Sequence, residues 1–371
     1  MVIGTRPEAI KLAPVAHALS ERGLAPSLVL TGQHPGLDPG DYGLGAFSVQ
    51  RLRCPGAEDP HRHVRAVTLA LQRLRGRAPD LIVVQGDTSS ALGAALAAFT
   101  ARVPVGHVEA GLRTHDPLLP WPEEEYRAAI DANADLLFAP TTTAAANLRT
   151  ENVSGEIHVT GNTAIDALLA VEAELPSATT CGRTFPTILV TCHRRESWGS
   201  GLQSIATAIA ELSDRAVIRL VLHPNQHVRT QIRARLQGIS NIHLIEPCSH
   251  RELLKLMRDS DLVMSDSGGI QEETPALGVP LLVLREKTER PEGIAAGSAR
   301  LVGTSTDRIV SEARQLLDNP AALAAMAVRR FPYGDGHAAP RIAAVIDAWL
   351  ERSAGGAVPS ARMSPGHPAR W

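Results

Sequence analysis

Short apolar runs alternate with longer amphipathic stretches along the first half of the chain. The runs lie at Ser27–Thr31, Leu81–Gln85, Val103–Val108 and Asp135–Ala139. They are five or six residues long, and turn-forming residues such as Gly32 and Gly86 follow them. Runs this short predict buried strands, and the stretches between them, such as Asp59–Arg75, predict helices.

The same alternation restarts after a polar segment, Leu175–Thr187, which contains two prolines. The second set of runs lies at Thr187–Cys192, Val217–His223, Ile242–Ile245, Leu262–Met264 and Leu281–Leu284. Strands that alternate with helices predict parallel sheets with helices on both faces. The predicted fold class is α/β, with two Rossmann-like, doubly wound domains at 1–174 and 175–336. A helix at about 337–353 is expected to join the first domain, and 354–371 has the composition of a disordered tail.

Composition narrows the class of protein. A chain of 371 residues is long enough for two domains, and a formal charge of −2 leaves no basic footprint for nucleic acid or for a membrane surface. No run is long enough to span a membrane, and the start lacks the pattern of a signal peptide, so we expect a cytoplasmic protein. The four cysteines are scattered without a CxxC pair, so no metal site is predicted.

The segment Asp261–Arg290 predicts a strand, a glycine-containing turn, a helix and a second strand. Ser267 can cap the helix, while Gly268 and Gly269 let a ligand approach the backbone. Free amides and the positive end of a helix dipole suit a phosphate. Glu273, one turn inside the helix, could accept from ribose hydroxyls. The alternative is that Ser-Gly-Gly is only a turn between two core elements.

Other charged residues lie at predicted turns of the first domain. Arg6 is placed in the turn after a very short first strand, and Lys11 follows it by five residues. Both could face the carboxyl end of the sheet, where open parallel sheets bind ligands. The alternative is that they are solvated surface charges.

Three carboxylates of the first domain lie at or beyond predicted strand ends. Asp87 follows a buried strand, although it could equally cap the next helix. Glu109 closes an apolar strand, where a carboxylate must be paired or used because burying it alone costs several kcal/mol. Glu123 opens a helix, where a favourable contact with the helix dipole is an alternative explanation.

Basic residues follow two predicted strands of the second domain. His193 lies directly after the strand at Thr187–Cys192, and Arg194 beside it favours an anionic partner. His223 ends the next strand and has weaker support. If the two sheets face each other, these residues and the three carboxylates line one cleft, in which crowded carboxylates can provide both an acid and a base.

Ten segments carry a family resemblance. In order they are GTRPEAIKLAP, GQH, QGDTSS, HVEAGLRT, PWPEEEYR, VTGNTAIDAL, CHRRESWG, LHPNQH, SDSGGIQEETPALGVP and TERPE. Together they resemble the non-hydrolysing UDP-N-acetylglucosamine 2-epimerases, from Gly4 to about Pro291. The resemblance implies a glycosyltransferase-B-like fold, a homodimer, and reversible conversion of UDP-N-acetylglucosamine to UDP-N-acetylmannosamine without metal or nicotinamide cofactor. The reaction would eliminate UDP to a 2-acetamidoglucal and add it back.

The resemblance also implies roles for individual residues. The acid/base set around the sugar would be Asp87, Glu109 and Glu123, and His193 would act with them and on the diphosphate. The remaining contacts to UDP or the sugar would come from Arg6, Lys11, Gln33, Arg127, Arg194, His223, Ser267, Gly268, Gly269, Glu273 and Arg290.

The chain departs from the family pattern at three places. Only three residues precede Gly4, Tyr126 stands where the family favours Asn, and a loop rich in Pro and Gly at Gly32–Gly45 replaces an expected helix. Bacterial members bind a second UDP-N-acetylglucosamine as an activator near this loop, and we do not expect that activation here. A hydrolysing relative that releases N-acetylmannosamine and UDP, and a catalytically silent nucleotide-sugar-binding protein, remain alternatives.

Overall fold

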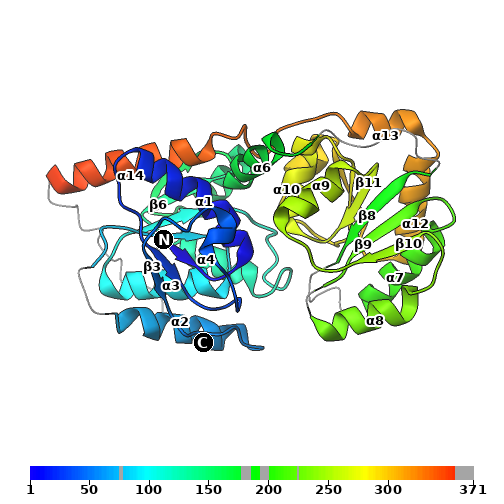
Figure 1. The fold of residues 1–371 in the computed structure, drawn as a ribbon. Coiled ribbons are helices and arrows are strands. Elements are labelled where there is room, and N and C mark those ends of the chain that lie inside the picture. The colour runs from blue at the N-terminus through cyan, green and yellow to red at the C-terminus, as the bar shows by residue number, and fades with distance from the viewer. Residues whose placement is uncertain (75–77, 177–184, 193–199, 224, 356–371) are drawn as a thin grey trace.

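The computed structural model describes residues 1–74, 78–176, 185–192, 200–223 and 225–355, and all structural statements refer to these residues. They form three sheets in which every pair of neighbouring strands is parallel. Figure 1 shows two α/β units side by side. This arrangement confirms the predicted fold class.

The amino-terminal unit contains two of the sheets. The first has the order β1 (Val2–Ile3), β2 (Leu28–Leu30), β3 (Val49–Arg51). The second has the order β4 (Ile82–Gln85), β5 (Val105–Val108), β6 (Leu136–Ala139), β7 (Glu156–Val159). Strand β1 lies beside β4, so the polar residues that follow these strands lie at one edge.

Helices cover the sheets of the amino-terminal unit. They are α1 (Arg6–Glu21), α2 (Pro60–Gln72), α3 (Ser89–Ala101), α4 (Glu123–Asp131), α5 (Thr142–Thr150) and α6 (Thr163–Ala173). The last helix of the chain, α14 (Ala338–Gly355), returns to this unit and packs against α1 (Figure 1). Leu12 of α1 and Ile342 of α14 are fully buried in the same apolar core.

The carboxyl-terminal unit contains one sheet. Its strand order is β10 (Ile242–Ile245), β9 (Val217–Val221), β8 (Thr187–Thr191), β11 (Leu262–Ser265), β12 (Leu281–Val283), β13 (Ala299–Leu301). The helices are α7 (Ser200–Leu212), α8 (Gln226–Leu236), α9 (His250–Arg258), α10 (Gly268–Leu277), α11 (Glu292–Ala295), α12 (Thr306–Leu317) and α13 (Pro320–Met326). Among the described residues, no helix combines the length and apolarity needed to cross a bilayer.

Helix α6 contacts both units. It packs against α1 of the amino-terminal unit and against α10 of the carboxyl-terminal unit. Ile165 and Leu168 of α6 are buried in the core that also contains Val283 and Ile270. Because α6 shares a core with α10, the start of α10 has a fixed position relative to the amino-terminal unit.

The nine strands predicted from the two sets of apolar runs agree with the structure to within two residues at each end. Thr5 and Glu8 form a capping box at the start of α1. The placement of Arg6 in a turn is wrong, since Arg6 is the first residue of α1. The predicted loop Gly32–Gly45 contains a short 3-10 helix, Pro39–Tyr42.

Several elements were missed. Strand β3 has a mostly exposed, polar sequence, and β13 has three residues, so neither gives a strong apolar signal. Helix α12 does carry a signal, because its buried Ile309, Ala313 and Leu316 recur at helical spacing.

Candidate active site

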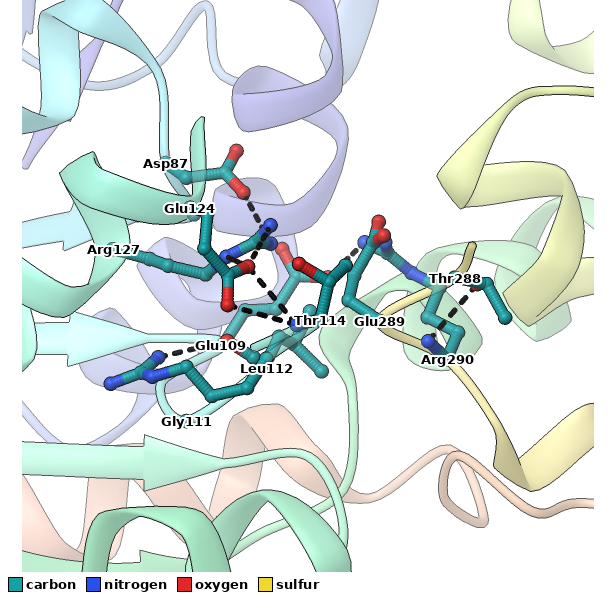
Figure 2. A network of polar contacts seen from close by, with 12 residues as sticks. Asp87, Glu109, Gly111, Leu112, Thr114, Glu124, Arg127, Thr288, Glu289 and Arg290 are labelled. Atoms are coloured by element: carbon teal, nitrogen blue, oxygen red, sulfur yellow. Dashed lines mark hydrogen bonds and ion pairs between the residues drawn. The ribbon is translucent and has the colours of Figure 1, made fainter. Parts of the chain in front are cut away.

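Glu109 is the centre of a buried polar cluster at the end of β5. Its side chain is 5% exposed, and its Oε1 accepts from Lys11 Nζ at 2.6 Å, Arg290 Nη2 at 3.1 Å and Asn162 Nδ2 at 3.1 Å. Gln85 donates to the other oxygen. These donors come from both units, so Glu109 lies where the units meet (Figure 2). The sequence predicted that this carboxylate is either paired or used, and the structure shows that it is paired.

A second buried carboxylate, Glu272 of α10, meets the same two cations. Glu272 Oε1 lies 2.5 Å from Arg290 Nε, and Glu272 Oε2 lies 3.0 Å from Lys11 Nζ. Two cations therefore bridge two carboxylates, with one of each charge contributed by each unit. Lys11 is buried, so its interpretation as a solvated surface charge is wrong. Sequence reasoning missed Glu272 because it singled out the next residue, Glu273.

The two carboxyls ionise as a coupled pair. Burial alone would raise the pKa of Glu109, but Lys11 and Arg290 outweigh it and hold that pKa well below its usual range. Burial raises the pKa of Glu272 to about 7, because the attraction of the same cations is opposed by the charge of Glu109. The site thus contains one carboxylate that is always ionised near neutral pH and one carboxyl that exchanges a proton there.

Arg290 is held against the predicted phosphate turn. A Cβ added to Gly268 would lie 2.8 Å from Arg290 Nη1, so this position must be glycine for the guanidinium to lie there. The backbone N–H of Arg290 donates to Thr288 Oγ1 at 3.1 Å, and its Nη1 contacts Glu289 (Figure 2). The guanidinium and the turn that begins α10 therefore face the same space.

Ser267 occupies the N-cap position of α10, but its side chain makes no capping hydrogen bond. The predicted N-cap position of Ser267 is therefore correct, but its side chain does not form the capping hydrogen bond. Its backbone N–H donates instead to Ser265 Oγ at 3.0 Å. The Ser267 hydroxyl thus remains next to Gly268 and Gly269. Among the described residues, and apart from the chain neighbours and the nearby backbone of α10, no heavy atom lies within 4 Å of a Cβ added to Gly269.

Asp87 belongs to a second network, which Figure 2 shows beside Glu109. Its Oδ2 lies 2.7 Å from Arg127 Nη1, and Arg127 Nη2 lies 2.9 Å from Glu124 Oε2. Glu124 also accepts from the backbone N–H of Thr114 at 2.9 Å. The alternative that Asp87 caps the next helix is wrong, because Thr88 Oγ1 accepts from the backbone of α3.

Glu8 connects α1 to the Asp87 turn and was not singled out from the sequence. It accepts from Thr88 Oγ1 at 2.6 Å and from the backbone N–H groups of Gly4 and Thr5. Burial raises the pKa of Glu8. The spacing of Thr5 and Glu8 is that of a capping box, and this signal in the sequence could have identified Glu8.

The other predicted residues of the amino-terminal unit lie near this edge. Arg6 is exposed, and its backbone N–H donates to His34 Nδ1 at 3.4 Å. Gln33 Oε1 accepts from Ser90 Oγ at 2.6 Å. Glu123 is half-buried at the first position of α4, directly before the Glu124 that pairs with Arg127.

The remaining predicted residues belong to the carboxyl-terminal unit. Glu273 Oε1 lies 2.7 Å from His250 Nε2, and although burial lowers the pKa of His250, this carboxylate raises it above its ordinary value. His223 Nδ1 accepts from the backbone N–H of Asn225 at 2.9 Å. His193 and Arg194 lie outside the described residues. Among the described residues, no group of three His, Cys, Asp or Glu is arranged to hold a metal ion.

The chemistry available here follows from the charges. Lys11 and Arg290 can bind an anion, and the turn at Gly268 offers backbone N–H groups to the same anion. Glu109 and Asp87 are carboxylates held by buried cations on the opposite side, where they can exchange protons with a bound molecule.

Comparisons with known proteins agree with this geometry. The family model described as UDP-N-acetylglucosamine 2-epimerase matches residues 17–347. A probable UDP-N-acetylglucosamine 2-epimerase of Ralstonia nicotianae is 42% identical, over 94% of this chain and 98% of that protein. The UDP-N-acetylglucosamine 2-epimerase of Escherichia coli K12 is 41% identical, over 92% of this chain and 96% of that protein.

Solved structures give the same result. The crystal structure of the Neisseria meningitidis UDP-GlcNAc 2-epimerase, bound to UDP-GlcNAc, superposes with a TM-score of 0.87 at 37% identity. The match covers 94% of this chain and 98% of that one. The Methanocaldococcus jannaschii UDP-GlcNAc 2-epimerase, in complex with UDP-GlcNAc and UDP, gives 0.82 at 30% identity, over 94% and 98% of the two chains. This chain belongs to the UDP-N-acetylglucosamine 2-epimerase family.

Proposed function

We propose that this protein interconverts UDP-N-acetylglucosamine and UDP-N-acetylmannosamine by eliminating UDP and adding it back. The observation that carries the proposal is the pairing of Lys11 and Arg290 with Glu109 and Glu272 at the junction of the two units. Cations and carboxylates are both needed there, because a diphosphate must leave while a proton is removed from the sugar.

The UDP would bind mainly to the carboxyl-terminal unit. Ser267, Gly268 and Gly269 would hold phosphate, and Glu273 would accept from the ribose hydroxyls. The contact between Arg290 and Gly268 supports this placement, because it directs a cation to the N-terminus of α10. The other proposed UDP and sugar contacts are Arg6, Lys11, Gln33, Arg127, His193, Arg194 and His223.

The sugar would lie against the carboxylates of the amino-terminal unit, namely Asp87, Glu109 and Glu123. One carboxylate removes the C2 proton, the C2–C1 bond gains double-bond character, and the C1–O bond breaks as UDP leaves. This gives the 2-acetamidoglucal. UDP then adds back at C1 while an acid returns a proton to the other face of C2, which inverts that centre and consumes no other reagent.

Ligand binding would rearrange the charges. Without ligand, Lys11 and Arg290 neutralise Glu109 and Glu272. A diphosphate competes for the same two cations, so it weakens their hold on the carboxylates. Glu109 would then become a stronger base when the substrate is present, because it is the cations that lower its pKa.

Four further features belong to the proposal. We infer that the two units are domains that divide near residue 175, with α14 belonging to the first. Homodimerisation is inferred from the resemblance alone. The cytoplasmic location and the absence of activation by a second UDP-N-acetylglucosamine stay predictions.

Product analysis by NMR in deuterium oxide tests the reaction. Purified protein with UDP-N-acetylglucosamine should give UDP-N-acetylmannosamine, with deuterium at C2 of both sugars. Turnover without C2 exchange would exclude the elimination mechanism. Free N-acetylmannosamine and UDP as main products would identify the hydrolysing reaction, and calorimetric binding without turnover would identify a silent binding protein. The Glu312→Gln variant is a matched control, since Glu312 forms a partly exposed ion pair with Arg300.

A further inference from the structure

His107 of β5 and Asp131 at the end of α4 form a buried pair beneath the edge that carries the carboxylates. Both residues have 0% exposed surface, and His107 Nδ1 lies 2.6 Å from Asp131 Oδ1. Neither residue can touch a ligand, and neither is part of the proposed acid/base set. A buried polar pair is costly unless it is fully hydrogen-bonded, so its remaining contacts indicate what it does.

Each member of the pair holds the backbone beside one proposed acid/base residue. His107 Nε2 lies 2.8 Å from the carbonyl oxygen of Gly86, which directly precedes Asp87. A carbonyl oxygen only accepts, so Nε2 donates. Asp131 Oδ2 accepts from the backbone N–H of Gly111, two residues after Glu109, at 3.1 Å. One chain of contacts therefore connects the two turns.

These turns need support because of their backbone conformations. Glu109 has φ +70°, which is unfavourable for a residue with a side chain, and Gly86 and Gly111 have φ +66° and +84°. A Cβ on Gly111 would lie 2.3 Å from the carbonyl oxygen of Ala144. The turn after β5 is thus packed closely against α5. Asp131 of α4 contacts the same turn through the backbone N–H of Gly111.

Arg113 forms a further ion pair with Asp131. Its Nη1 lies 2.8 Å from Asp131 Oδ2, and its Nη2 lies 2.6 Å from Glu151 Oε2. Burial alone would raise the pKa of Asp131, but His107 and Arg113 hold it below its ordinary value. Asp131 is therefore kept as an acceptor, and both ring nitrogens of His107 are occupied, so the ring is not available for proton transfer to a ligand.

We propose that His107 and Asp131 are positioning residues, which hold the turns of Asp87 and Glu109 at a fixed separation for work on one sugar. This inference rests on the proposed function. In catalysis by positioned groups, a displacement of about 1 Å can cost roughly 100-fold in rate. Loss of the pair should therefore lower kcat strongly, whereas UDP should still bind to the carboxyl-terminal unit.

The variants His107→Gln and Asp131→Asn test this. The first replaces the two ring nitrogens, which contact Asp131 and the Gly86 carbonyl separately, by one amide nitrogen, so it cannot keep both contacts. The second keeps the size of Asp131 but removes its charge. His158→Asn is the matched control, because His158 lies in β7 of the same sheet, 3.4 Å from the carboxylate of Glu156. Each protein is assayed for kcat by NMR and for UDP affinity and stoichiometry by calorimetry, so that activity is expressed per UDP-binding site.

We expect kcat per binding site to fall about 100-fold in both variants, with the UDP Kd within about threefold of wild type, and no change in the control. Unchanged kcat per binding site, or UDP affinity that falls in proportion to kcat, would overturn the positioning role. If His107→Gln does not fold, the same outcomes for Asp131→Asn decide. An inactive wild-type protein would instead contradict the proposed function.

Discussion

The substitution Glu272→Gln tests the electrostatics of the site through stability. Glu272 has a side chain that is 1% exposed, and burial raises its pKa from 4.5 to about 7. A carboxyl whose pKa is higher in the folded state than in the unfolded chain binds its proton more tightly when folded. Its contribution to stability is therefore complete below about pH 4.5 and is lost as the pH rises to about 7.

The size of this loss follows from the pKa difference. At about 1.4 kcal/mol per pKa unit, a rise from 4.5 to about 7 corresponds to about 3 kcal/mol. The pKa of about 7 already includes the attraction of Lys11 and Arg290, which lowers the pKa of Glu272. Burial and the charge of Glu109 raise that pKa by more. Glutamine resembles the protonated carboxyl in shape and does not ionise. The Glu272→Gln variant should therefore not lose this stability as the pH rises.

The assay is urea unfolding of both proteins between pH 5 and pH 8. At pH 5 the variant should be more stable by less than about 1 kcal/mol, and at pH 8 by about 3 kcal/mol. Titrating groups that do not interact with Glu272 cancel in the comparison, and Glu109 stays ionised between pH 5 and pH 8 because Lys11 and Arg290 hold its pKa well below that range. Glu312→Gln, at a partly exposed ion pair with Arg300, shows the effect of the substitution itself. The reasoning would be refuted if the difference in free energy of unfolding between the two proteins did not change with pH. It would also be refuted if the wild-type protein became more stable relative to the variant as the pH rises.

Three other substitutions test the division of roles. Asp87→Asn should lower kcat about 100-fold or more while calorimetry shows a UDP Kd within about threefold of wild type, because a proton-transfer group is lost. Arg290→Lys should weaken UDP binding about tenfold or more, since an ammonium cannot contact Glu109, Glu272 and a phosphate as a planar fork does; unchanged affinity would remove Arg290 from the diphosphate site. Gly268→Ala should also weaken binding, because its Cβ would lie 2.8 Å from Arg290 Nη1, and a crystal structure with an unmoved guanidinium would contradict this.

The sequence predicted well which candidate site residues lie after the ends of strands. In a parallel sheet, a polar residue directly after a buried strand must lie at the carboxyl edge, and this placed Asp87 and Glu109 correctly. The rule needs only the local pattern of apolar residues. It also predicted that Glu109 would be paired or used, although its partner Lys11 lies 98 residues away and could not be identified by spacing.

Residues inside helices were predicted less well, because a run of similar residues does not show which one faces the site. In the segment Gln271–Glu273 every residue is buried, and only the position of Arg290 decides that Glu272 faces Glu109. Three consecutive glutamates begin α4, and only the structure shows that Glu124 pairs with Arg127.

The four central charges also explain why single residues were hard to interpret. A buried cation or carboxylate alone is unfavourable, because its charge is left without compensation. Lys11 and Glu109 come from one unit and Glu272 and Arg290 from the other. Each unit therefore contributes one ion pair of its own, and the two pairs contact each other through Lys11 with Glu272 and through Arg290 with Glu109. Because these cross contacts exist only where the two units meet, the four-charge arrangement is a property of the junction.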